Sequence, residues 1–212
     1  MIIVANWKMN KDLQESKLFF NNFESKLSNQ ATSFFEKIKI LIAPSFPFLY
    51  HCQFNLSSNK IIIAAQNCSH KSNGAFTGEV SAKMLNSIGV KYVIIGHSER
   101  RVYFNEKRDV LKNKIQLCLE NNLCPIFCFG ETGLDREKGN HLTVIQEQLD
   151  IISKQGAGKI TLAYEPVWAI GSGKTPSIEQ IKEVHSYVKA LYDLPILYGG
   201  SLNQNNAKIA EK

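Results

Sequence analysis

The chain alternates short apolar runs with longer amphipathic stretches, and this alternation restricts its fold more than any other feature. Each run is almost continuously apolar, a pattern typical of parallel strands that are buried on both faces. Repeated alternation of strand and helix predicts a parallel sheet, either closed into a barrel or doubly wound. The runs are Ile2–Ala5, Ile38–Ala43, Ile61–Ala65, Tyr92–Ile95, Pro125–Phe129, Ile160–Ala163 and Ile196–Tyr198.

Four of the stretches between the runs carry apolar residues three or four positions apart, which places them on one side of a helix. Ser177 and Gln180 resemble a capping box at the start of the last of these helices. The chain has no low-complexity segment and no Gly/Ser linker, so we expect residues 1–212 to form a single domain. The helical sets are Phe20, Phe23 and Leu27; Leu111, Ile115 and Cys118; Leu142, Ile145, Leu149 and Ile152; and Ile178, Ile181, His185 and Val188.

Composition excludes several classes of protein. With 44% hydrophobic and 21% charged residues, the sequence does not resemble a disordered chain. The net charge of +6 favours anionic ligands, but the cations are spread along the chain, as they also are on solvated helix faces. Because no concentrated basic patch with interleaved aromatic residues is present, we do not expect a nucleic-acid partner.

The five cysteines are odd in number and form no CxxC pair, and no histidine cluster has metal-ligand spacing. This pattern indicates reduced structural thiols and no metal site. The first residues lack the features of a signal peptide, and no apolar run approaches the roughly 20 residues that span a bilayer. We therefore expect a cytoplasmic protein without a membrane partner.

Polar side chains follow three of the predicted strands. Asn6 and Lys8 end the first, His97 follows the fourth and Glu165 ends the sixth. Each residue alone is more often a solvated or locally hydrogen-bonded side chain than a catalytic one. Because active sites of parallel α/β folds gather at the carboxyl ends of strands, the coincidence of these residues predicts that one cation, one imidazole and one carboxylate point into one mouth.

Two glycine-rich stretches indicate phosphate binding. Gly171–Thr175 follows the sixth strand and Gly199–Ser201 follows the seventh. Glycine lets the backbone approach an anion closely, although either stretch alone fits a simple turn. The first is not a P-loop, because Trp168 stands where that motif needs a glycine.

Seven segments, in order over essentially the whole chain, resemble the triosephosphate isomerase family. They are Asn6–Asn10, Ala64–Asn67, Gly74–Glu79, Ile95–Arg101, Cys128–Glu131, Ala163–Gly171 and Tyr198–Ser201. The resemblance implies a (β/α)8 TIM barrel of α/β class without a cofactor. It also implies an isomerase of glycolysis and gluconeogenesis that interconverts dihydroxyacetone phosphate and D-glyceraldehyde 3-phosphate by proton transfer through an enediolate.

The resemblance also implies a role for each site residue. Glu165 would remove the proton, and a neutral His97, at a helix N-terminus, would polarise the carbonyl oxygen. Lys8, held by Asn6, would supply positive charge for the phosphate and the enediolate. The backbone N–H groups of Gly171 and Ser201 would bind the phosphate.

Two further segments match functional parts of the family. Residues 166–175 would form a lid, with Ser172 and Pro176 departing from the usual residues within or beside it. The long segment Gln66–Gly78 would be a dimer loop that places Thr77 beside Asn6 and His97 of the partner subunit. The resemblance therefore implies a homodimer.

The length is the one feature that does not fit the family. The chain has 212 residues, about 40 fewer than the roughly 250 typical of the barrel. After Ser201 the sequence indicates only a helical start, Asn205–Glu211, so we expect a barrel truncated at its C-terminus, without the eighth strand and last helix. An alternative function follows, that of a catalytically impaired relative that only binds anions or partners.

Overall fold

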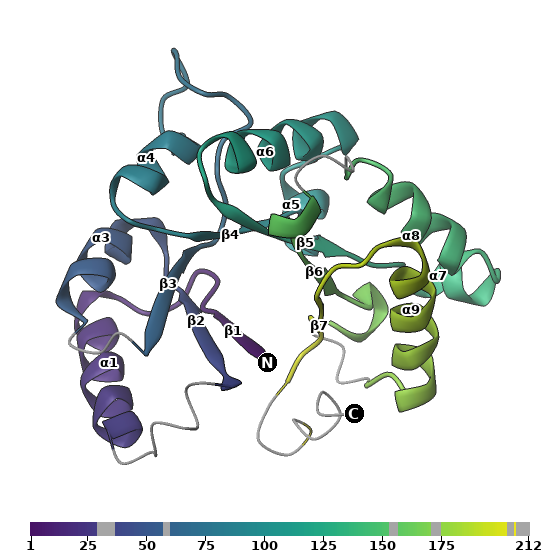
Figure 1. Ribbon diagram of the computed structural model, residues 1–212, viewed down its shortest axis with the longest axis horizontal. Coiled ribbons are helices and arrows are strands. Elements are labelled where there is room, and N and C mark those ends of the chain that lie inside the picture. The colour runs from purple at the N-terminus through teal and green to yellow at the C-terminus, as the bar shows by residue number, and fades with distance from the viewer. Residues whose placement is uncertain (29–36, 57–59, 153–156, 171–174, 203–205, 207–212) are drawn as a thin grey trace.

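The computed structural model describes residues 1–28, 37–56, 60–152, 157–170, 175–202 and 206. Within them, seven parallel strands follow one another around a nearly closed barrel with helices on its outside (Figure 1). The α/β barrel class is therefore confirmed, and each strand begins and ends within one residue of a predicted apolar run. The strands are β1 (Ile2–Asn6), β2 (Lys39–Ala43), β3 (Ile61–Ala65), β4 (Tyr92–Ile95), β5 (Cys124–Phe129), β6 (Thr161–Tyr164) and β7 (Ile196–Tyr198).

The helices follow the strands in turn, and the four predicted apolar stripes lie on α1, α6, α8 and α9. Ile152 is the exception, because α8 ends at Leu149. Both side chains of the predicted capping box, Ser177 and Gln180, bond the backbone at the start of α9. The helices are α1 (Leu13–Ser28), α3 (Phe46–Asn55), α4 (Ala82–Ser87), α5 (Ser98–Tyr103), α6 (Arg108–Glu120), α7 (Gly133–Glu137), α8 (His141–Leu149) and α9 (Ile178–Leu191), with short 3-10 turns η1 (Ala157–Lys159) and η2 (Val167–Ala169).

Side chains along each strand alternate between two apolar layers, as strand geometry requires. On β5, Phe127 and Phe129 join the larger core between sheet and helices, whereas Ile126 and Cys128 join the smaller cluster inside the barrel. Burial on both faces explains why the runs in the sequence are continuously apolar.

The first and last strands are less buried than those between them. Within the described residues, β1 pairs only with β2 and β7 only with β6. All three residues of β7 are half-buried, and Ile3 of β1 is 45% exposed, whereas β2 and β3 are mostly buried. The predicted helical start at Asn205–Glu211 lies, except for Asn206, outside the described residues.

No helix in the described part of the chain is both long enough and apolar enough to cross a membrane.

Candidate active site

The alternation of β1 carries Asn6 to the inner side of the barrel mouth. Ile2 and Val4 pack on the cluster inside the barrel, and Asn6 continues the same alternation at the end of the strand. The chain turns at Lys8, whose φ of 54° is left-handed, and the Asn6 side-chain oxygen accepts the Lys8 N–H at 2.9 Å. The Lys8 carbonyl accepts a further hydrogen bond from the Gln66 amide at 2.9 Å. These contacts fix the backbone from which the Lys8 ammonium extends.

His97 caps the N-terminus of α5, directly after β4. Its Nδ1 accepts the backbone N–H of Glu99 at 3.2 Å. An accepting Nδ1 carries no proton, so the hydrogen of a neutral ring lies on Nε2. That nitrogen lies 3.5 Å from Oε1 of Glu165, and His97 is 9% exposed. The structure thus turns the donor end of the imidazole toward the predicted base.

Glu165 lies just beyond β6, two positions after Ala163, which faces the barrel interior. The residue is 4% exposed, and its Oε2 accepts the backbone N–H of Ser98 at 3.0 Å. A buried carboxylate is costly unless it accepts hydrogen bonds. The Ser98 N–H, at the start of α5, meets that need and holds the carboxylate beside His97.

A buried thiol lies beneath this carboxylate. Cys128 points into the barrel from β5, where its thiol feels the negative charge of Glu165. Burial, together with the negative charge of Glu165, raises the pKa of the Cys128 thiol well above its usual value. The thiol therefore stays protonated and cannot compete with Glu165 as a base.

Lys8 forms an ion pair that was not predicted. Its Nζ donates to Glu99 Oε1 at 2.7 Å, and the two side chains are 39% and 40% exposed. Half-exposed pairs are screened by water and contribute little to stability. The Lys8 ammonium therefore remains accessible to solvent beside Glu99.

Arg101 places a second cation below the site. Its guanidinium donates to the carbonyls of Gly96 at 2.7 Å and Cys128 at 2.8 Å, which joins β4 to β5. Burial lowers the pKa of Arg101, and the negative charge of Glu165 opposes that effect. Glu99, Cys128 and Arg101 were not singled out as site residues, yet all three lie in segments that carry the family resemblance.

The beginning of the predicted lid is tied to the barrel by one carboxylate. Oε1 of the fully buried Glu131 accepts hydrogen bonds from Trp168 Nε1 at 2.8 Å, Tyr164 Oη at 3.0 Å and Arg136 Nε at 2.9 Å. The predicted phosphate ligand Gly171, and Ser172 with it, lie outside the described residues.

In the described part of the chain, two predicted residues form no hydrogen bond or ion pair with Lys8, His97 or Glu165. Ser201 is exposed after β7, and its carbonyl accepts the Asn206 amide at 2.9 Å. Thr77 is exposed in the segment between β3 and α4, which projects away from the barrel (Figure 1). No group of three or more histidine, cysteine or acidic side chains in the described residues is arranged to hold a metal ion.

The chain is similar to known proteins over nearly its whole length. The family described as Triosephosphate isomerase matches residues 1–211. A protein of Porphyromonas gingivalis named triosephosphate isomerase is 41% identical over 221 residues, which cover 98% of this chain and 86% of that protein. Proteins of the same name from Flavobacterium johnsoniae and Aquifex aeolicus are 39% and 40% identical, again over 98% of this chain and over 86% and 87% of their own lengths.

Proposed function

The chain belongs to the triosephosphate isomerase family, and we propose that Glu165, His97 and Lys8 carry out its reaction. The chain is a triosephosphate isomerase, which interconverts dihydroxyacetone phosphate and D-glyceraldehyde 3-phosphate. The observation that carries the assignment of roles is the 3.5 Å approach of His97 Nε2 to Oε1 of Glu165, both of them buried side chains.

Glu165 acts as the base in this proposal. Its carboxylate removes a proton from the carbon beside the carbonyl, and the electron pair moves onto the carbonyl oxygen to give an enediolate. The same carboxylate returns the proton to the neighbouring carbon, so no proton or electron is gained or lost. Substrate displaces the carboxylate from the Ser98 N–H, which now holds it at 3.0 Å.

His97 is the proposed hydrogen-bond donor and proton carrier for the two substrate oxygens. Its Nε2–H donates to the carbonyl oxygen while negative charge develops there, and it then relays the proton between the two substrate oxygens. The N–H of Glu99 on Nδ1 supports this role, because it keeps the ring hydrogen on the nitrogen that faces Glu165. A ring in the other tautomer would present no donor to the substrate.

Lys8 provides the positive charge. A phosphate at the mouth competes with Glu99 for the Lys8 ammonium, and the lysine then stabilises both the phosphate and the enediolate. Asn6 positions Lys8 through its bond to the backbone N–H, and we propose that the N–H groups of Gly171 and Ser201 complete the phosphate site.

We further propose that the active protein is a homodimer. Residues 71–79, with Thr77 among them, are all exposed. Large apolar side chains are also exposed after β3 and β4, at the same end of the barrel; they are Phe76, Val102, Tyr103 and Phe104. Contiguous exposed apolar surface is typical of interaction sites. A second copy of the chain would cover it and bring Thr77 to the partner's site.

An isomerase assay with glyceraldehyde 3-phosphate tests the assigned roles. We expect Glu165→Gln to lower kcat by about 10²–10⁴-fold, the usual contribution of a positioned base. Glu120→Gln, which makes the same change on the exposed end of α6, leaves the rate unchanged. Equal, negligible rates for the unaltered chain and Glu165→Gln would instead support the impaired, anion-binding alternative, which no observation in the described residues favours.

A further inference from the structure

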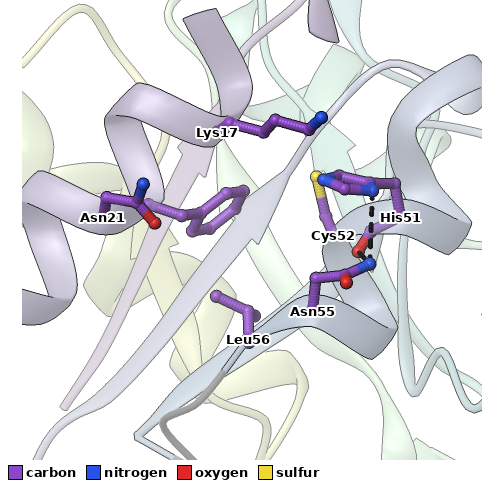
Figure 2. A pocket seen from close by; sticks show the side chains of 7 residues that line it. Lys17, Asn21, His51, Cys52, Asn55 and Leu56 are labelled. Atoms are coloured by element: carbon purple, nitrogen blue, oxygen red, sulfur yellow. Dashed lines mark hydrogen bonds between the residues drawn. The ribbon is translucent and has the colours of Figure 1, made fainter. Parts of the chain in front are cut away.

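A cavity of about 230 Å³ lies between α1 and α3, apart from the residues assigned above (Figure 2). It is lined by three residues of α1, three of α3 and Leu56, the residue that follows α3.

The floor of the cavity is apolar. Phe20 is 7% exposed and Cys52 is 1% exposed, and half-buried Leu56 adds a branched side chain. Burial raises the pKa of the Cys52 thiol to about 11, so it is uncharged at neutral pH and adds to the apolar surface. A floor of this kind favours the hydrocarbon part of a ligand.

The rim of the cavity carries hydrogen-bond donors from both helices. Lys17 of α1 extends across the cavity toward the ring of His51 on α3 (Figure 2). The Asn55 amide nitrogen lies 3.2 Å from His51 Nδ1 and donates to the His51 carbonyl at 2.8 Å. Because an amide nitrogen only donates, Nδ1 accepts and the hydrogen of a neutral ring lies on Nε2. Figure 2 shows that second ring nitrogen turned toward the cavity.

None of the described residues that line the cavity is acidic. The ammonium of Lys17, the Nε2–H of His51 and the amide of Asn21 are therefore not opposed by a carboxylate at the cavity wall. Donors on the rim and hydrocarbon on the floor are together the features that recognise a small anion with an apolar body.

We propose that this cavity binds a small monocarboxylate whose carboxylate bonds Lys17 and His51 and whose apolar body rests on Phe20 and Leu56. The volume, below the roughly 300 Å³ at which sites for drug-sized molecules begin, suits a ligand of about one ring. A bare phosphate would leave the apolar floor uncovered, which is why an organic acid fits better.

Trp7 lies close enough to the cavity for its fluorescence to report binding there. The Phe20 ring lies 5.4 Å from the ring of Trp7, centroid to centroid, and Trp7 precedes Lys8 in the chain. A ligand on Phe20 therefore changes the surroundings of Trp7. Since the chain has two tryptophans, Trp168→Phe leaves Trp7 as the single fluorophore.

Phenylacetate is a suitable probe. We expect saturable binding with a dissociation constant on the order of millimolar, as is usual for so small a ligand. Equilibrium dialysis of labelled phenylacetate measures it on the full chain, and Trp7 fluorescence in Trp168→Phe follows it independently. Both are run with saturating inorganic phosphate, which occupies the active site. Binding that phosphate abolishes would place the probe in the active site and overturn the proposal.

Matched variants and ligands test the recognition itself. Lys17→Met is expected to weaken binding about tenfold, the usual effect of removing a hydrogen bond to a charged group. Lys26→Met, an equivalent change on the exposed last turn of the same helix, leaves binding unchanged. The neutral analogue phenylacetamide also binds about tenfold less tightly. Equal binding of the two ligands, full affinity in Lys17→Met or no saturable binding in dialysis would each refute the site.

Discussion

The carbonyl group of Glu165 lies so close to the α-carbon of Gly130 that a β-carbon there would stand 1.8 Å from the carbonyl oxygen. The pairing of β5 with β6 extends to this point, because the Glu165 N–H donates to the Phe129 carbonyl at 2.7 Å. Gly199 approaches from the other side, and a β-carbon on it would lie 2.9 Å from Cγ of Glu165. The position of the proposed base thus depends on two residues without side chains.

Gly130→Ala should destabilise the protein by about 3 kcal/mol or more, because the backbone of β5 or of Glu165 must shift to admit the methyl group. Urea unfolding measures the loss. Gly158→Ala is the control, since a β-carbon at Gly158 meets nothing within 4 Å. Wild-type stability and activity in Gly130→Ala would show that Glu165 is not held by this contact.

Lys8→Met should raise KM strongly and lower kcat/KM by about 10²-fold or more, because a cation at the phosphate and enediolate is lost. Stability should change by less than about 1 kcal/mol, since the pair with Glu99 is about 40% exposed on each side. Lys39→Met, at the start of β2, removes an exposed lysine without these effects. Similar kinetics for the two variants would remove Lys8 from the proposed mechanism.

Phe76→Asp should shift the protein from dimer to monomer in sedimentation experiments. Phe76 is 42% exposed beside Thr77, and a carboxylate buried between two copies would be costly. Leu18→Asp makes the same kind of change at a residue of α1 that is 62% exposed, and it should leave the dimer intact. A monomeric unaltered chain with full activity would contradict the proposed assembly.

The cysteines should differ in their reaction with thiol reagents at pH 8. Burial raises the pKa of the Cys52 thiol to about 11, and burial with the charge of Glu165 raises the pKa of Cys128. A raised pKa leaves less thiolate at a given pH, and the thiolate is the nucleophile. We expect half-buried Cys124 to be labelled first, and Cys52 and Cys128 only after unfolding in urea. Mass spectrometry of the labelled peptides decides this, and early labelling of Cys128 would be inconsistent with its packing.

Asp135 should make a small, pH-dependent contribution to stability. Hydrogen bonds from the Thr132 hydroxyl and backbone N–H lower the pKa of its carboxyl group. A lowered pKa stabilises the fold above the unfolded value of about 3.9, and this stabilisation is lost as pH falls through the folded value. In urea unfolding, Asp135→Asn should therefore cost less than about 1 kcal/mol at pH 7. The difference should shrink as pH falls from 5 toward 3, and a constant difference would exclude this linkage.

The sequence alone determined where the strands lie and which polar residues follow them. Strands inside a ring of helices must be apolar on both faces, so their positions are visible as continuous runs such as Ile61–Ala65. Strand alternation then accounts for the inward placement of Asn6 and Glu165. Both properties are local, and a local pattern is enough to predict them.

Only the tertiary structure decided which groups meet. The Ser98 N–H that holds Glu165 is 67 positions away, and Glu99, which pairs with Lys8, is 91 positions away. The close approach of the Glu165 carbonyl to Gly130 and the cavity between α1 and α3 likewise depend on how separate elements pack. The apolar pattern in the sequence indicates which face of a strand or helix is buried. The curvature of the barrel sets the distances between side chains from different strands and helices.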